Sequence, residues 1–128
     1  SLIGEKAFDR QFASVFSAQH PISPEGLHQH WSAIQRRDGV RNYHRLIYYL
    51  SERRENKARW EATLEHPGVP VRFLWGHQDP VSGRHMAERI LERMPQADLL
   101  ALEDVGHYPQ LEAPERVVAE ILHWAAGA

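Results

Sequence analysis

The stretch VRFLWGHQDP, residues 71–80, decides the fold. Its first half is a short apolar run that begins after Pro70 and ends at Gly76, which predicts a buried β-strand over residues 71–75. Residues 76–83 then predict a loop, and this loop carries Asp79. A carboxylate directly after a buried strand lies where open α/β sheets build their sites.

A second strand and loop of the same kind follow. The run DLLAL predicts a strand over residues 98–102, and residues 103–113 predict a loop that carries His107. Helices are predicted over 84–94 and over 114–126. Strand, helix, strand, helix indicates parallel strands with crossover helices, so we expect Asp79 and His107 to meet at one sheet edge. The last helix is expected to turn its apolar side chains toward a core: Val117, Val118, Ile121, Leu122 and Ala125.

An aspartate beside a histidine is suited to acid–base catalysis. A histidine that acts as general base presents one ring nitrogen to the reacting group, while a carboxylate on the other nitrogen fixes the tautomer. Gly76 and Gly106 suit turns that bring the backbone close. Taken singly, Asp-Pro after a strand is a turn signal, and one Gly-His among nine histidines is a surface residue. Their joint placement after consecutive strands favours the catalytic interpretation.

The first half of the chain predicts helices only. One is expected over residues 5–18, and a second, capped by Ser23 with Pro24 at its first position, runs to about residue 37. A third runs from about residue 40 through the fifties, with a separate fourth helix near 57–64 as an alternative. The third helix is expected to turn four side chains inward: Tyr43, Leu46, Ile47 and Leu50.

Composition excludes several classes of function. A net charge of −2 argues against nucleic acid as a partner, and no apolar run approaches the roughly 20 residues of a membrane span. The absence of cysteine removes disulfides, thiolate metal sites and cysteine nucleophiles, and it fits a cytoplasmic location. His20, His28 and His30 match no compact metal-ligand spacing. We therefore expect no metal and no cofactor.

Two motifs resemble the C-terminal end of the α/β-hydrolase fold family. They are Trp-Gly-x-x-Asp-Pro at residues 75–80 and Gly-His-Tyr-Pro-x-Leu-Glu-x-Pro at residues 106–114. The resemblance covers residues 69–126 strongly, and by it Asp79 matches the triad acid and His107 the triad histidine.

The resemblance implies an α/β class chain with a partial α/β-hydrolase fold. Residues 1–66 would be a helical cap segment, and residues 67–128 would be two parallel strand–helix units of the core. The cap and the histidine loop are similar to the mesoderm-specific transcript proteins, which sit near the epoxide hydrolases and haloalkane dehalogenases. Gly106 departs from that subgroup, where serine is expected.

The family's nucleophile elbow, Gly-x-Ser-x-Gly or Gly-x-Asp-x-Gly, does not occur in these 128 residues. Nor does a His-Gly segment for an oxyanion hole, and Ser82 is expected at most to cap a helix. We therefore expect the chain alone to be inactive. The parent would hydrolyse a small apolar substrate, an epoxide, haloalkane or ester in that order, with aspartate favoured over serine as its nucleophile.

Three aromatic residues are candidates to contact that substrate. The stretch from Asn42 to Arg45 resembles the segment of epoxide hydrolases that carries a ring-protonating tyrosine, which nominates Tyr43, with Tyr49 as a second candidate. Trp31 is a candidate to line a pocket under the cap. The alternative for all of them is ordinary packing.

Two further hypotheses stay open. Two strands are too few for a stable parallel sheet, so the open sheet edge needs a missing N-terminal half or self-association to cover it. The start at Ser1 without methionine favours a piece of something longer. The chain is then either a hydrolase part, a non-catalytic binding or oligomerisation module that keeps Asp79 and His107 as relics, or an inactive fragment.

Overall fold

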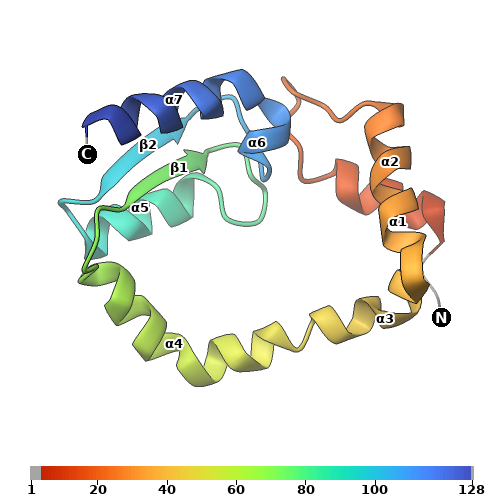
Figure 1. Ribbon diagram of the computed structural model, residues 1–128, viewed down its shortest axis with the longest axis horizontal. Helices are drawn as coiled ribbons and strands as arrows, with labels where there is room; N and C mark the ends of the chain where they lie inside the picture. Colours follow the sequence, from red (N-terminus) through yellow and green to blue (C-terminus); the bar gives the residue numbers. More distant parts are fainter. Residues whose placement is uncertain (1–3, 128) are drawn as a thin grey trace.

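The computed structural model describes residues 4–127, apart from the side chain of Tyr43. Its elements form an open ring in Figure 1. Helices α1 (Glu5–Ala13) and α2 (Pro24–Gln35) make one side, and the strands with α5 (Arg84–Arg93), α6 (Pro109–Glu112) and α7 (Pro114–Gly127) make the other. The short 3₁₀ turn Arg36–Asp38, α3 (Gly39–Leu46) and α4 (Tyr49–Glu65) connect the two sides as an arch.

The sheet of the described residues has two parallel strands, β1 (Arg72–Gly76) and β2 (Asp98–Leu102), paired in register from Arg72 with Asp98 to Gly76 with Leu102. Helix α5 makes the crossover between them. The partial α/β fold class is therefore confirmed. The second strand has the predicted bounds, and the first is displaced by one residue. Leu102 and Val105, where the second strand ends, are fully buried.

Helix α2 begins as predicted, because the Ser23 hydroxyl accepts a hydrogen bond from the Gly26 N–H at 3.0 Å and proline occupies the first turn. Helix α1 ends at Ala13 rather than near residue 18. The backbone beyond it is engaged elsewhere: Val15 O accepts from the His107 N–H, and the Ser17 N–H donates to Glu112. These long-range bonds replace the local ones that a longer helix would make.

The prediction for the third helix is wrong in two respects. The helix breaks at residues 47–48, and three side chains expected inward are exposed: Leu46 by 66%, Ile47 by 55% and Leu50 by 44%. The alternative, a separate helix that begins near residue 57, is also wrong, because α4 begins at Tyr49 and runs through that residue. Glu61 and Glu65 of α4 form ion pairs with Arg93 of α5. The arch is thus joined to the sheet side by charges at its end rather than by an apolar core.

Other apolar side chains also lie at the surface. Against expectation, Val118, Ile121 and Leu122 of α7 are more than half exposed. Trp60 of α4 is 41% exposed. Trp75 is half-buried, and its ring N–H donates to Ser82 O at 2.6 Å. Within residues 4–127, no helix combines the length and apolarity that crossing a membrane requires.

Candidate catalytic site

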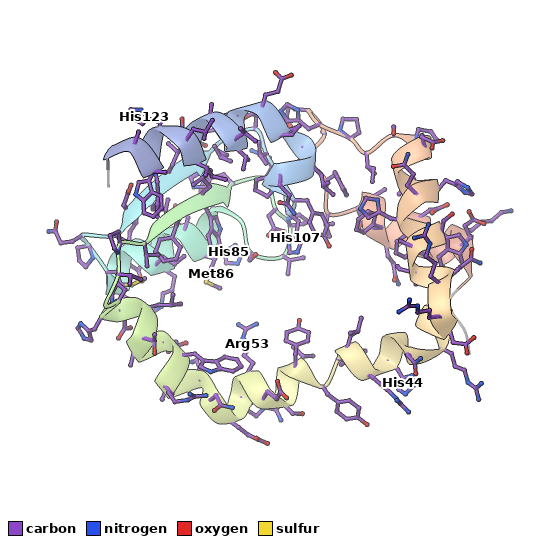
Figure 2. All side chains as sticks on the ribbon, viewed as in Figure 1. His44, Arg53, His85, Met86, His107 and His123 are labelled. Atoms are coloured by element: carbon purple, nitrogen blue, oxygen red, sulfur yellow. The ribbon has the colours of Figure 1, made fainter. Side chains whose placement is uncertain are left out.

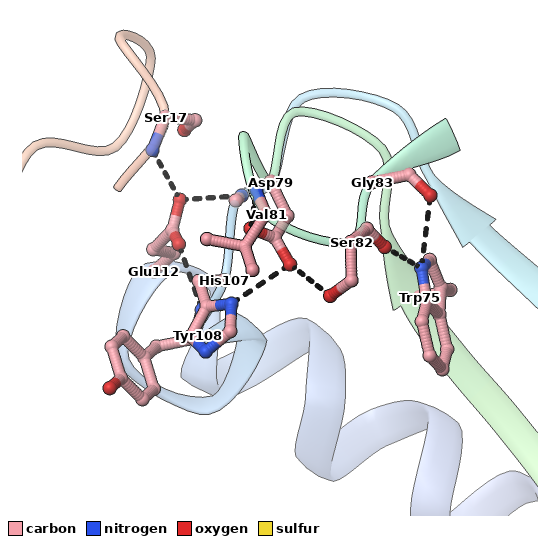
Figure 3. A network of polar contacts seen from close by, with 10 residues as sticks. Ser17, Trp75, Asp79, Val81, Ser82, Gly83, His107, Tyr108 and Glu112 are labelled. Atoms are coloured by element: carbon pink, nitrogen blue, oxygen red, sulfur yellow. Dashed lines mark hydrogen bonds and ion pairs between the residues drawn. The ribbon is translucent and has the colours of Figure 1, made fainter. Parts of the chain in front are cut away.

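Asp79 and His107 meet where the two strands end. His107 Nδ1 lies 2.8 Å from Asp79 Oδ2 (Figure 3). An ionised carboxylate only accepts hydrogen bonds, so Nδ1 carries the proton and donates it to Asp79. The neutral ring then keeps a lone pair on Nε2, which is the nitrogen that a general base uses.

Asp79 is buried, with 8% of its surface exposed. Its Oδ1 accepts from the Val81 N–H at 2.8 Å, and its Oδ2 also accepts from the Ser82 hydroxyl at 2.6 Å. Burial acts to raise the pKa of Asp79, but the hydrogen bonds from Ser82, Val81 and His107 outweigh it and lower the pKa below its ordinary value. The acid is therefore charged at neutral pH and can stabilise an imidazolium.

Ser82 has a different role from the one predicted. Helix α5 has Gly83 at its N-cap, without a side-chain cap hydrogen bond. The hydroxyl of Ser82 is instead directed to Asp79 (Figure 3). It orients the acid, and only the folded loop reveals this because the two residues are three positions apart around a turn.

Glycines allow the two loops to touch. A Cβ atom on Gly76 would lie 2.0 Å from Gly106 O, and one on Gly106 would lie 2.7 Å from Ser17 N. Both positions therefore exclude a side chain unless the backbone moves. The predicted close approach of the backbone at these two glycines is confirmed.

Sequence reasoning missed Glu112 as a site residue. Its buried carboxylate accepts from the N–H groups of Gly106 and Tyr108, on either side of His107, and from that of Ser17. The only available signal was its place in the second motif.

An aromatic cluster extends from His107 into the helical side of the ring. The His107 ring lies 4.8 Å from the Tyr108 ring, Tyr108 lies 5.3 Å from Phe12, and Phe12 lies 5.2 Å from Phe8. Trp31, 7% exposed, packs on Phe8 at 5.5 Å. Trp31 is thus connected to His107 through a series of ring contacts that passes through Phe8, Phe12 and Tyr108.

The two tyrosine candidates lie on the arch. Tyr49 begins α4 and is 57% exposed, and the side chain of Tyr43 lies outside the described residues. In Figure 2, Arg53 of α4 and Met86 of α5 point toward the middle of the ring, which His107 also borders.

Two cavities differ in their relation to the pair. One of about 140 Å³ is lined by Asp79, His107, Trp75, Ser82 and Pro109 among others. A larger one of about 520 Å³ lies at the amino ends of the strands, beside Val71 and Asp98. Of these two cavities, Asp79 and His107 line only the smaller one.

Three histidines considered for a metal have separate partners. His20 pairs with Asp104 at 2.8 Å, His28 with Glu5 at 3.6 Å, and His30 Nδ1 with the Gly26 carbonyl at 2.8 Å. Among residues 4–127, no three histidine or acidic side chains gather in a way that could hold a metal ion.

Asp79 and His107 thus place a buried carboxylate beside an imidazole, on loops that follow adjacent parallel strands, where open α/β sheets commonly build their sites. The family model described as the alpha/beta hydrolase family matches residues 4–120, and the chain belongs to this family.

Curated relatives agree. The chain is 36% identical over 114 residues to LipZ of Mycobacterium tuberculosis, provisionally named a hydrolase, covering 89% of this chain and 40% of LipZ. It is 30% identical over 109 residues to the human mesoderm-specific transcript homolog protein, covering 84% of this chain and 32% of that protein. A third relative is the cis-3-alkyl-4-alkyloxetan-2-one decarboxylase of Shewanella oneidensis. The chain is 36% identical to it over 56 residues, which cover 44% of this chain and 18% of that protein.

The chain therefore spans two fifths or less of the length of these relatives. No solved structure matches it significantly.

Proposed function

We propose that Asp79 and His107 are the acid and the general base of a hydrolytic triad. The nucleophile and the oxyanion hole would be supplied by sequence outside these 128 residues. The observation that carries the proposal is the 2.8 Å contact between His107 Nδ1 and the buried carboxylate of Asp79. Residues 1–66 would act as the cap of that enzyme, and residues 67–128 as the end of its core.

The chemistry follows from the free Nε2 of His107. With a serine nucleophile, Nε2 takes the hydroxyl proton as an acyl-enzyme forms and returns it to the leaving group. With an aspartate nucleophile, the carboxylate attacks carbon directly, and Nε2 then takes a proton from the water that hydrolyses the ester. In both cases Asp79 stabilises the imidazolium that forms.

The substrate class we propose is a small, mostly apolar molecule with an electrophilic carbon: an epoxide, a haloalkane or an ester. Two observations support it. An aromatic cluster that runs from Tyr108 to Trp31 lies beside His107. The relative from Shewanella is named for an alkyl-substituted oxetan-2-one, which is a strained cyclic ester with apolar substituents.

The decisive experiment starts from the gene. The coding sequence upstream of Ser1 is determined and the complete reading frame is expressed. We expect an elbow motif there, and turnover of p-nitrophenyl butyrate or styrene oxide by the complete protein but not by the 128 residues alone. His107→Ala is expected to lower kcat by roughly 10⁴-fold.

His123→Ala is the matched control, because His123 is exposed on α7, far from His107 in Figure 2. It is expected to keep full activity. Wild-type kcat in the His107→Ala enzyme, or turnover by the 128 residues alone, contradicts the proposal.

A second candidate is an assembly module without activity. The exposed apolar side chains of the arch and of α7 favour it, because such surface is normally covered by a partner. Sedimentation of the purified chain tests it. A tight dimer supports self-association, whereas a monomer up to high concentration argues against it.

A further inference from the structure

The buried carboxylate of Glu112 is held by backbone groups from two distant parts of the chain. Oε2 accepts from the N–H of Gly106 at 2.7 Å and of Ser17 at 2.9 Å, and Oε1 accepts from the N–H of Tyr108 at 3.1 Å. Glu112 is 7% exposed, and no cationic side chain of the described residues forms an ion pair with it. A buried charge without a counter-ion depends on its hydrogen bonds, so these three contacts are an essential part of its environment.

Those contacts surround His107. Gly106 and Tyr108 are its two neighbours in sequence, and the N–H of His107 itself donates to Val15 O at 3.0 Å. Three successive amides of the base loop are therefore bonded. Because a Cβ atom on Gly106 would lie 2.7 Å from Ser17 N, the loop also packs directly against the segment between α1 and α2.

Position matters for a general base more than for an ordinary surface histidine. The ring of His107 must reach Asp79 with Nδ1 and the reacting atom with Nε2 at the same time. Catalytic geometry is held within about 0.5 Å, and a displacement of about 1 Å can cost 10²-fold in rate. The hydrogen bonds from the amides of Gly106 and Tyr108 to Glu112, and from the amide of His107 to Val15 O, hold the backbone that carries the imidazole in place.

We infer that Glu112 is a positioning residue for His107, which locks the backbone of residues 106–108 and joins it to residues 15–17. The orientation of the base is thereby coupled to the placement of the N-terminal helices. The inference rests on the proposed function for the role of His107 as a base.

The first test uses the 128-residue chain and needs no activity. Glu112→Gln keeps the shape but replaces one acceptor oxygen with an NH₂ group, which cannot accept from a backbone N–H. We expect the NMR signal of the His107 Nδ1 proton to shift or broaden, and the amides of residues 17, 106 and 108 to exchange at least about tenfold faster. Glu115→Gln, at an exposed glutamate in the first turn of α7, is the matched control.

A folded Glu112→Gln chain with unchanged signals overturns the inference. If that variant does not fold, the same contacts are measured in the wild-type chain. Through-hydrogen-bond couplings from the amides of residues 17, 106 and 108 to the Glu112 carboxyl carbon, together with slow amide exchange, support the inference. Rapid exchange of these amides contradicts it.

The second test uses the complete enzyme. Glu112→Gln is expected to lower kcat by roughly 10- to 100-fold with KM changed less than about twofold, because a misplaced base slows the chemical step rather than binding. Glu112→Asp, which keeps the charge, should recover part of kcat. If His107→Ala abolishes turnover while Glu112→Gln equals Glu115→Gln, the inference fails and the proposed function stands. If His107→Ala is active, the proposed function fails.

Discussion

The anchored region and the arch of this chain differ in how their structure is held. The anchored region comprises α1, α2, the two strands and the loops up to Glu112, and it contains the fully buried Leu102 and Val105 as well as the Asp79–His107 pair. The arch comprises α3 and α4, and its apolar side chains near residues 46–50 are exposed. Long-range hydrogen bonds and ring contacts stabilise the first, whereas local helix bonds and a few ion pairs hold the second. The Asp79–His107 pair lies in the part whose geometry the chain itself determines.

Two tryptophans give the largest contrast between these regions. Trp31 is 7% exposed and packs on Phe8, whereas Trp60 on α4 is 41% exposed. Trp31→Ala is expected to lower the free energy of unfolding by about 3–5 kcal/mol, the usual cost of emptying an aromatic core position. Trp60→Ala should cost under about 1 kcal/mol. Urea unfolding of the two variants measures both, and equal losses would remove the distinction.

The charge of Asp79 gives an intermediate effect that depends on pH. Because the pKa of Asp79 is lowered in the folded chain, its stabilisation is complete above the unfolded value of about 3.9 and is lost as pH falls through the folded pKa. Asp79→Asn should cost roughly 1.5–3 kcal/mol at pH 7, since it replaces hydrogen bonds to a charged group. Unfolding measured from pH 7 to pH 2 should show the gap between wild type and variant closing below about pH 4.

The other carboxyl groups with lowered pKa values, Glu61, Glu103 and Asp104, are present in both proteins. They affect the free energy of unfolding of wild type and variant alike, so the difference between the two proteins reports on Asp79 alone. A gap that stays constant over the whole pH range would show that the charge of Asp79 does not contribute to folding.

Much of the anchored region could be predicted from the sequence. The second strand, the Ser23 cap and the approach of the two loops follow from short patterns, because strand boundaries and helix caps depend on residues within a few positions. The residues that orient the pair could not be found in this way. Glu112 accepts a hydrogen bond from the N–H of Ser17, which lies 95 positions away in the sequence. The hydroxyl of Ser82 reaches Asp79 only once the turn between them has formed.

The arch was mispredicted for the opposite reason. Its helical periodicity indicated an inward apolar face at Leu46, Ile47 and Leu50, yet the described residues include nothing that covers them. A periodic pattern shows that a face is made to be buried, but it does not say which segment buries it.

The same face therefore gives the smallest expected effect in this chain. The double substitution Leu46→Gln, Ile47→Gln should change the free energy of unfolding of the 128 residues by about 0.5 kcal/mol or less, since both side chains are already more than half exposed. In the complete protein, a segment packed on the arch would make each leucine or isoleucine worth roughly 1.5–3 kcal/mol. Chemical unfolding of the 128-residue chain and of the complete protein, each with and without the double substitution, measures how much stability the two side chains contribute in each. A large loss in the complete protein identifies the arch as a covered face, whereas a small loss in both shows that it stays open to solvent.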